Sequence, residues 1–443
     1  MKSPRKALIV FLKYPEVGKV KTRLGRDIGQ QRATNLYEKL IRRTLGIASD
    51  FRLSQDDQEG VDLFLFFTPP DRKAILRKTC PGPWEFLPQP GGHLGARMRS
   101  AFRDLFCNGY EQVVLIGTDV ADLMVSDIEG AFRFLRGGEV VLGPAQDGGF
   151  YLIGLSLPFE KMFQFDSWSH SSIFERTLGC LVDSGLTVRT LPERRDIDRA
   201  EDLITIKDVS LFRDKISIII PFDGRVTQLA SLIDSLEAQL WPGDEVIIAR
   251  ADGFPRLRTE HITPHTRLLS APRGRGIQLD HGARLADGNL LWFLHADTVP
   301  PPNFGYHVRK VSQASDTSLG CFELDYGTSR LSLQLVARLA NFRTRYLGLP
   351  YGDQGLFCRK EVFEKVGGFR NQYLMEDVDF VRACKKVGKM MIIPQPLYSS
   401  PQRFLMKGII RTSCKNHLVM FLYLLGMNNR SLYSLYYGRD VSR

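Results

Sequence analysis

The chain has 443 residues, of which 43% are hydrophobic and 25% charged, a composition typical of a globular protein. This length exceeds what one hydrophobic core normally serves, so two domains of about 200 residues each are expected. The formal net charge of +11 favours an anionic partner: a nucleotide, a phosphorylated sugar, anionic lipid or nucleic acid. Nucleic acid is the least favoured of these, because the sequence contains no long run of Lys and Arg.

The cysteines argue for a cytoplasmic protein with reduced thiols. They number seven, are scattered along the chain and contain no C-x-x-C pair, which speaks against a zinc site or a disulfide framework. The first apolar run, Ala7–Leu12, is shorter than the core of a signal peptide. No segment has the length of a bilayer-spanning helix, so a cytoplasmic location is expected.

The first half of the chain alternates expected strands with helices. Apolar runs predict strands at Lys6–Leu12, Val61–Phe67, Gln112–Gly117 and Val140–Gly143, and a helix is expected over Gln30–Ile47. Such alternation indicates an α/β domain with a mostly parallel sheet.

A basic loop follows the first expected strand. It carries Lys19 and Lys21 near Gly18, and Arg23 comes directly after it. Basic residues on a glycine-containing loop between a strand and a helix often hold phosphates. A solvated basic turn is an equally good interpretation of these residues alone.

Two acids in the first half stand where ligand-binding residues often lie. Asp119 directly follows the Gln112–Gly117 strand, and Asp147 precedes the double glycine Gly148-Gly149. Ligands of open α/β sheets bind beyond the carboxyl ends of strands, and glycines allow backbone to approach a ligand closely. Both acids are therefore placed where a side chain can come close to a ligand.

The pattern restarts near residue 209, which predicts domains at residues 1–208 and 209–443. Strands are expected at Ile216–Pro221, Glu245–Ala249 and Leu290–Leu294, with a helix at Asp223–Leu240. The Leu290–Leu294 run has no polar face, which suits a strand covered by helices on both sides. We expect this strand to stop at His295 and the prolines 300–302 to prevent the ladder from continuing.

Asp297 lies just past that strand and is the leading metal candidate. A carboxylate at this position can hold a divalent cation that binds a diphosphate. The alternative is that Asp297 is a solvated turn residue without a ligand. The glycine loop Ala271–Gln278 adds Arg273 and Arg275 as a possible phosphate clamp, with Gln278 at its end. A solvated basic loop is the equally favoured alternative.

Glu376 and Asp377 stand in the first turn of an expected helix and are the candidate catalytic acids. Asp377 is suited to general-base work, although acids at a helix start are also ordinary stabilising chemistry. At the C-terminus, Phe404–Tyr437 mixes apolar, aromatic and basic residues. Its apolar run Leu418–Leu425 predicts a packed helix, with a membrane-interface helix as the alternative.

Four motifs in the second half resemble family 2 glycosyltransferases of GT-A fold. They are GRGIQLDHGA (Gly274–Ala283), FLHADT (Phe293–Thr298), GLPYGDQGLF (Gly348–Phe357) and LMEDVDFVR (Leu374–Arg382). The likeness is greatest to the arsenosugar-biosynthesis branch, also called radical-SAM/selenodomain-associated transferase 2.

That resemblance implies a metal-dependent, inverting sugar transfer. It places Asp297 at the metal, either Mg²⁺ or Mn²⁺, and at the diphosphate of a nucleotide-sugar. Asp377 falls at the catalytic base, Asp353 and Gln354 at the acceptor side, and Arg403 near the diphosphate or acceptor.

The sequence departs from the family pattern at three places. Asp223-Gly224 stands where Asn-Glu is usual, and Asp280 stands where Asn is usual. Residues 249–253 read Ala-Arg-Ala-Asp-Gly where Asp-Gly-Gly-Ser is expected, so the acid for the nucleoside is taken to be Asp252. These changes bear on which nucleotide is bound.

Residues 6 to about 205 resemble the transferase 1 companion family, which is nucleotidyltransferase-like and akin to molybdopterin and phospholactate guanylyltransferases. The matching motifs are KVKTRL (Lys19–Leu24), LPQPGGHLGARM (Leu87–Met98), VVLIGTDVADL (Val113–Leu123) and VVLGPAQDGGFYLIGL (Val140–Leu155). By this resemblance, Lys21 and Arg23 contact a nucleoside triphosphate, and Asp119 and Asp147 serve metal and substrate. Val120-Ala121 replaces the family's usual Ser-Pro.

The sequence thus predicts two tandem Rossmann-like α/β domains in one sugar-nucleotide enzyme. The expected partners are a nucleotide-sugar, a nucleoside triphosphate and a small-molecule or lipid acceptor, and no nucleic acid. Two alternatives stay open. The first half can be a non-catalytic binding or docking module, or the whole chain can be a membrane-peripheral glycosyltransferase acting on a lipid at the inner face of the cell membrane.

Overall fold

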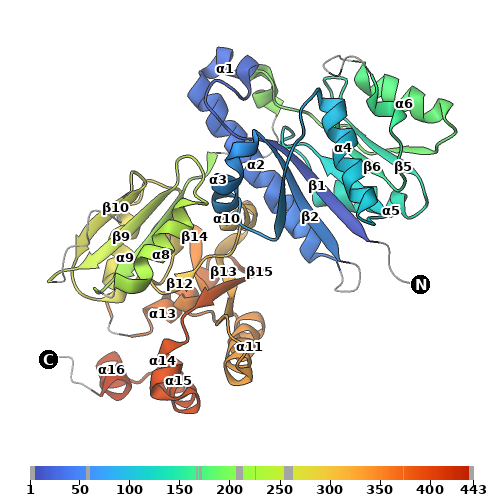
Figure 1. Ribbon diagram of the computed structural model, residues 1–443. Coiled ribbons are helices and arrows are strands. Elements are labelled where there is room, and N and C mark those ends of the chain that lie inside the picture. Colours follow the sequence, from blue (N-terminus) through green and yellow to red (C-terminus); the bar gives the residue numbers. More distant parts are fainter. Residues whose placement is uncertain are drawn as a thin grey trace. The chain divides into compact units, whose positions relative to one another are not determined.

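The computed structural model describes residues 5–55, 60–165, 168, 172–205, 213–224, 226–253, 263–372 and 374–438. The chain divides into two compact units, Met1–Phe212 and Arg213–Arg443, called unit 1 and unit 2. The predicted boundary between residues 208 and 209 lies outside the described residues. Each unit is an α/β domain with a mixed, mostly parallel sheet, which confirms the predicted fold class (Figure 1).

Unit 1, within its described residues, holds a seven-stranded sheet in the order β3-β2-β1-β4-β6-β5-β7. Only β6 runs antiparallel to its neighbours in this sheet, as described. The strands are β1 (Lys6–Lys13), β2 (Val61–Thr68), β3 (Trp84–Pro88), β4 (Gln112–Ile116), β5 (Val140–Pro144), β6 (Phe150–Leu155) and β7 (Val188–Thr190). The helices are α1 (Thr22–Ile28), α2 (Gln30–Leu53), α3 (Lys73–Thr79), α4 (Leu94–Cys107), α5 (Val125–Leu135) and α6 (Ile173–Asp183).

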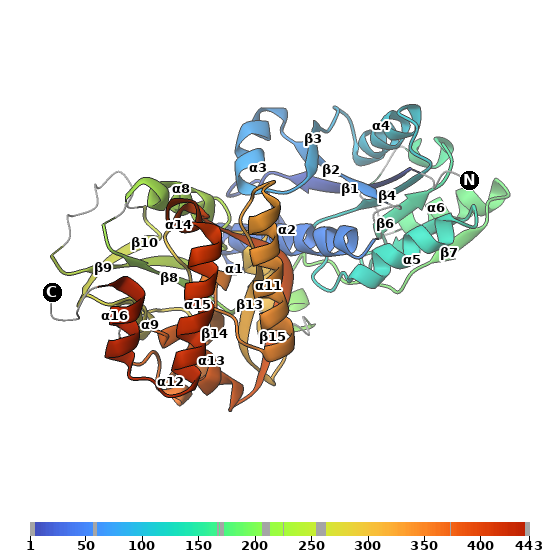
Figure 2. The same cartoon turned by 90° about the horizontal axis from the view of Figure 1, so that it is seen from below.

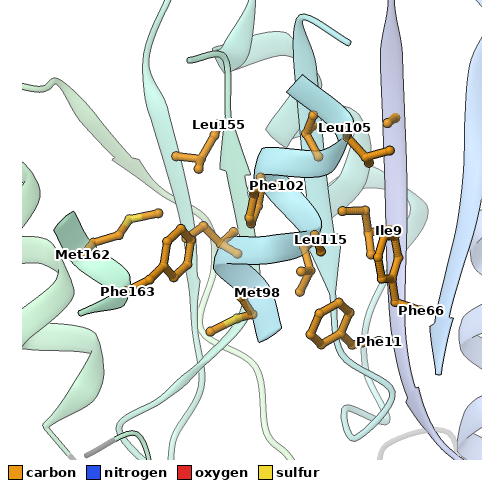
Figure 3. Close-up of a cluster of buried hydrophobic side chains, with 14 of the residues drawn as sticks. Ile9, Phe11, Phe66, Met98, Phe102, Leu105, Leu115, Leu155, Met162 and Phe163 are labelled. Carbon is orange, nitrogen blue, oxygen red and sulfur yellow. The ribbon is translucent and has the colours of Figure 1, made fainter. Parts of the chain in front are cut away.

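The core of unit 1 follows the two-residue period of its strands. Ile9 and Phe11 of β1 face the same cluster as Met98 and Phe102 of α4, so one sheet face is covered by this helix (Figure 3). The fully buried Leu8 and Val10 alternate with them and point to the opposite face.

Unit 2 holds an eight-stranded sheet among the residues described, in the order β10-β9-β8-β11-β14-β13-β15-β12. The strands are β8 (Ile216–Phe222), β9 (Glu245–Ala251), β10 (Thr266–Ala271), β11 (Leu290–Phe293), β12 (Thr298–Val299), β13 (Thr317–Asp325), β14 (Phe357–Arg359) and β15 (Lys389–Ser399). The helices are α8 (Val226–Glu237), α9 (Arg275–Arg284), α10 (Phe304–Ser312), α11 (Leu331–Leu347), α12 (Lys360–Val366), α13 (Glu376–Lys385), α14 (Gln402–Lys407), α15 (Ile409–Leu424) and α16 (Asn429–Tyr437).

Strand β11 is buried on both faces, as the unbroken apolar run predicts. Leu290 and Trp292 join the cluster that contains Phe304 of α10, while Leu291 and Phe293 join the opposite cluster with α9 and α13. The strand is parallel to β8 and antiparallel to β14.

The chain after β11 differs from expectation in one respect. Thr298 and Val299 form the short strand β12, which pairs antiparallel with β15 before Pro300 is reached. The expected block to further pairing therefore begins only at the prolines themselves, because Thr298 and Val299, unlike proline, have a backbone N–H and an unrestricted φ.

The C-terminal segment forms α14, α15 and α16, and α15 lies beside α11 (Figure 2). Val419 and Met420 of α15 are buried, whereas Leu418 and Phe421 are at least half exposed. The run Leu418–Leu425, which was predicted to form a packed helix, is therefore buried on one side and exposed on the other. Across the described residues, no helix combines the length and apolarity needed to cross a membrane.

Candidate active sites of the two units

In unit 2, one arginine joins the starts of two helices. Arg275 begins α9 after Gly274, whose φ of +144° favours glycine. Its guanidinium forms an ion pair with Glu376, lies 3.5 Å from Asp377 and lies 3.4 Å from the ring Nε2 of His295. Burial would lower the pKa of Arg275, but the two carboxylates outweigh it and raise that pKa. The guanidinium is therefore always charged and holds the three side chains together.

Asp377 is buried and fixed by the backbone. One carboxylate oxygen accepts a hydrogen bond from the Gly352 N–H at 2.9 Å, and the other accepts from the Val378 N–H at 2.9 Å. Asp377 lies in the first turn of α13, as predicted. A Cβ added to Gly352 would lie 3.0 Å from His295 Nε2 and 3.4 Å from Asp377 Oδ2. The absence of a side chain at residue 352 therefore lets this loop approach the acid closely.

His295 was not singled out in the sequence, although it is the first residue past the expected strand. Desolvation and the adjacent Arg275 charge lower its pKa to about 3, despite the opposing effect of Asp377. The imidazole is therefore neutral at physiological pH, so it can accept a hydrogen bond or a metal at one nitrogen. The sequence signal that could have identified it is its position two residues before Asp297.

Asp297 and Asp353 make the electrostatics of this site acidic. Asp297 lies in the partly buried turn after β11. Burial, followed by the charges of Asp377 and Asp297, raises the pKa of Asp353, although Arg343 and Arg275 oppose this shift. The buried Asp353 Oδ1 atom makes no hydrogen bond. An oxygen of this kind beside further carboxylates suits a hard cation.

The fit to a cation is limited by the number of protein ligands. Among the described residues, no three His, Cys, Asp or Glu side chains form a group that could hold a metal. Mg²⁺ and Mn²⁺ are commonly bound by one or two carboxylates together with phosphate oxygens and water. Asp297 and Asp353 fit that pattern, provided that a diphosphate supplies the remaining oxygens.

Two predicted substrate-binding amides lie beneath this site. Gln278 donates to the carbonyls of Phe222 at 3.0 Å and Ala249 at 2.6 Å, near the ends of β8 and β9. Gln354 has 0% exposure and accepts from the Thr344 hydroxyl at 2.7 Å. Because their side chains are directed into the protein, both residues shape the strand ends and the loop rather than facing solvent.

The other predicted residues of unit 2 are exposed. Asp252 follows β9, and Arg273 lies in the loop before α9. Since β8, β9, β10 and β11 are parallel, Asp252 and Asp297 both lie at the carboxyl edge of the sheet. Arg403 lies in α14 with its guanidinium 4.6 Å from the Tyr436 ring.

In unit 1, the basic loop and the strand-end acid meet. The Lys21 ammonium lies 2.8 Å from Asp119 and 3.0 Å from Asp198, and Arg23 lies 3.6 Å from Asp198. Burial would lower the pKa of Lys21, but the two carboxylates outweigh it and raise that pKa. Lys19 instead pairs with Glu16 at 2.7 Å.

These residues border a hollow of about 280 Å³. Its lining includes Lys13, Lys19, Lys21 and Arg23, with only Asp119 and Asp198 as acids. The volume approaches the lower end of the range for small-molecule sites. The excess of positive charge favours an anionic ligand such as a phosphate chain.

Asp147 lies in the double-glycine turn and interacts electrostatically with a further acid, Asp196. Its Oδ1 accepts from the Gly149 N–H at 2.8 Å, and Gly148 has a φ of +86°. Burial and then the charges of Asp147 and Asp198 raise the pKa of Asp196 to about 6. Asp196 and Asp198 were missed in the sequence; the signal was two acids flanking the buried Ile197.

Comparisons with known proteins match each unit separately. Residues 53–170 match a family described as "Uncharacterized protein conserved in bacteria (DUF2064)", and residues 217–367 match "Glycosyl transferase family 2". No curated protein matches the chain.

Several solved structures are similar to parts of the chain. A proposed nucleotide-diphospho-sugar transferase from Desulfovibrio desulfuricans G20 is 31% identical over 47% of this chain and 90% of its own, with a TM-score of 0.42. The mannosyltransferase PcManGT from Pyrobaculum calidifontis, in complex with GDP-Man and Mn²⁺, is 14% identical over 51% of this chain and 70% of its own, with a TM-score of 0.40.

Glucosyl-3-phosphoglycerate synthase from Mycobacterium tuberculosis, with Mn²⁺, UDP and phosphoglyceric acid, is 15% identical over 44% of this chain and 74% of its own, with a TM-score of 0.33. These scores are too low to carry an inference about activity. The family matches locate a DUF2064 domain in the N-terminal half of the chain and a glycosyl transferase family 2 domain in the C-terminal half.

Proposed function

We propose that unit 2 is a metal-dependent glycosyltransferase that moves a sugar from a nucleotide-sugar to an acceptor hydroxyl with inversion. The observation that carries this proposal is the fixed Asp377 carboxylate, held by the Gly352 N–H at 2.9 Å and by Arg275 beside the acids Asp297 and Asp353. The match of residues 217–367 to glycosyl transferase family 2 supports it.

In the proposed reaction, Asp377 accepts the proton of the acceptor hydroxyl as that oxygen attacks the anomeric carbon. The bond from this carbon to the diphosphate oxygen breaks, and its electron pair leaves with the nucleoside diphosphate. Asp297 and Asp353 would hold a divalent cation, which would supply positive charge to the diphosphate. Arg275 fixes the orientation of Asp377, while Arg273, Asp252 and Arg403 are proposed to contact substrate from the exposed rim.

Unit 1 is proposed to act as a nucleotidyltransferase that activates a sugar phosphate for unit 2. The basic hollow around Lys21 and Arg23 supports binding of a triphosphate, and Asp119 and Asp147 are the proposed metal and substrate ligands. Because Lys21 pairs with Asp119, binding of a cation requires the ammonium to move onto phosphate. A non-catalytic docking module is the second candidate, favoured by Val120-Ala121 in place of Ser-Pro.

We also propose that unit 2 belongs to the arsenosugar-biosynthesis branch of the family 2 glycosyltransferases. The motifs of residues 274–283 and 374–382 support placement with the arsenosugar-biosynthesis enzymes. The proposed cation is Mg²⁺ or Mn²⁺, because both take carboxylate and phosphate oxygens as ligands.

The full chain should hydrolyse or transfer at least one nucleotide-sugar in a panel of UDP-, GDP- and dTDP-sugars, with Mn²⁺ or Mg²⁺ required. Asp297→Asn should abolish this turnover, and the exposed Asp234→Asn of α8 is the matched control. Activity retained in Asp297→Asn, or activity unchanged in EDTA, would contradict the metal assignment. For unit 1, formation of a nucleotide-sugar from triphosphate and sugar phosphate, lost in Asp119→Ala, would exclude a docking module without catalysis.

A further inference from the structure

Helices α11 and α15 expose two apolar stripes that nothing in the proposed reaction uses. On α11 the stripe is Leu331, Leu335, Leu339, Phe342 and Tyr346, with exposed fractions from 52% to 81%. These positions are separated by four, four, three and four residues, so they share one side of the helix. The opposite side carries the buried Leu333, Ala337 and Thr344.

The stripe on α15 has the same spacing. It consists of Ile410, Cys414, Leu418, Phe421 and Leu425, the last lying at the C-cap; Ile410 is 80% exposed and Leu425 69%. The side of α15 that packs inward carries Thr412, Val419 and Met420. Each helix therefore carries an outward apolar stripe in addition to the side that packs against the core, unlike a surface helix whose outer side is polar.

The two helices form one surface. They lie side by side in unit 2 (Figure 2), and Leu333 of α11, Phe404 of α14 and Ile409 of α15 share one hydrophobic cluster. Met406, between these helices in the chain, is 84% exposed. We call the exposed apolar residues of α11, α14 and α15 the apolar face. Exposed apolar residues on neighbouring helices often mark an interaction site.

The two segments that contain the apolar face are basic. Residues 326–352 contain four Arg, and residues 400–438 contain five Lys or Arg, without one Asp or Glu in either segment. Arg338, Lys407 and Arg411 are exposed beside the stripes. This combination matches the composition of surfaces that bind bilayer interfaces, which join exposed Leu, Phe and Tyr to Lys and Arg.

We propose that the apolar face docks unit 2 onto a bilayer that contains anionic lipid. Lipid phosphates neutralise the basic residues, while the leucine and aromatic side chains enter the boundary between headgroups and acyl chains. A second copy of the chain is a poorer occupant, because an isologous contact would bring together two surfaces on which Lys and Arg predominate. The docking is independent of sugar transfer.

The test is flotation of the full chain with two kinds of vesicle. One kind contains phosphatidylcholine alone, and the other also contains about 30 mol% phosphatidylglycerol, which gives a strong negative surface potential. The chain should float with the anionic vesicles and bind neutral ones much more weakly. Binding should fall at high salt. Flotation with neither vesicle, or equally with both, overturns the proposal.

Two triple variants locate the contact. Arg338→Gln, Lys407→Gln and Arg411→Gln together should weaken partitioning about a hundredfold, at roughly fivefold for each charge. Ile410→Ser, Phe421→Ser and Leu425→Ser together should weaken it about tenfold or more. Each variant has a matched control that changes exposed residues elsewhere. The control for the charge variant combines Arg32→Gln, Lys78→Gln and Lys365→Gln. The control for the apolar variant combines Leu53→Ser, Val182→Ser and Leu285→Ser.

The controls should bind like the wild type, and all variants should keep the urea midpoint of the wild type. Loss of binding equal in variants and controls would contradict the assigned face. A stable dimer in solution that the Ile410, Phe421 and Leu425 variant dissociates would show that a second copy covers the face. Capture of an acidic protein through this face without vesicle binding would also overturn the lipid proposal. Asp377→Asn should float like the wild type, which separates docking from the proposed reaction.

Discussion

Arg275→Gln should destabilise unit 2, because the guanidinium neutralises two acids at once. At 3.5 Å and an effective dielectric constant of about 20, opposite unit charges attract by about 5 kcal/mol. The Arg275 side chain is 41% exposed, so solvent screening reduces the Asp377 contribution to about 1 to 2 kcal/mol. The Glu376 side chain is only 3% exposed, and leaving it unpaired adds about 2 kcal/mol. We expect a loss of about 3 to 4 kcal/mol in the free energy of unfolding.

The measurement is hydrogen exchange of unit 2 peptides in increasing urea, which reports this unit separately from unit 1. Glu376→Gln added to Arg275→Gln should restore about 2 kcal/mol, since it removes the unpaired charge. Arg284→Gln is the matched control: this arginine is also in α9, is 58% exposed and pairs with Asp280 at 2.7 Å. It should cost less than about 1 kcal/mol. A cost below about 1 kcal/mol for Arg275→Gln, or strict additivity with Glu376→Gln, would refute the reasoning.

Three further substitutions test the loops. Gly352→Ala should lower turnover about tenfold without unfolding the protein, because the added Cβ would lie 3.0 Å from His295 Nε2. The control Gly179→Ala adds a Cβ with nothing within 4 Å and should leave turnover unchanged. Gln354→Leu should cost about 2 to 5 kcal/mol in urea, since it removes the buried hydrogen bonds of Gln354 with the Thr344 hydroxyl and the Phe322 carbonyl. The more exposed Gln334→Leu should cost under about 1 kcal/mol. Lys21→Met should abolish thermal stabilisation by magnesium nucleoside triphosphates. The control Lys19→Met should weaken this stabilisation only slightly, because Lys19 pairs with Glu16. Equal effects of the two substitutions would contradict the assigned contacts.

The long apolar strands could be predicted from the sequence. Strands β1, β4, β8 and β11 are mostly apolar, because strands covered by helices on both faces need no alternation. Strand β15 could not be recognised in this way, because Pro394 and Pro396 interrupt it. The sheet accommodates them through an irregularity in its register with β13, between Phe322 and Glu323.

The candidate sites were predictable only in part. The acids at the start of α13 give a local signal, so the position of Asp377 follows from sequence spacing. The contacts of Arg275 with His295 and of Lys21 with Asp198 join residues 20 and 177 positions apart. Such pairings depend on which strand ends meet at one edge of the sheet, and the sequence periodicity does not contain this information. The inward orientation of Gln278 and Gln354 likewise depends on the carbonyl and hydroxyl groups that packing brings to them.

The most direct test of the central claim is a comparison of binding and turnover in Asp377→Asn. With the nucleotide-sugar that the screen identifies, Asp377→Asn should retain donor affinity within about threefold and lose about 10² to 10⁴ in single-turnover transfer. Asp234→Asn should match the wild type in both measurements. Transfer by Asp377→Asn at the wild-type rate, with donor affinity unchanged, would contradict the assignment of this carboxylate as the base.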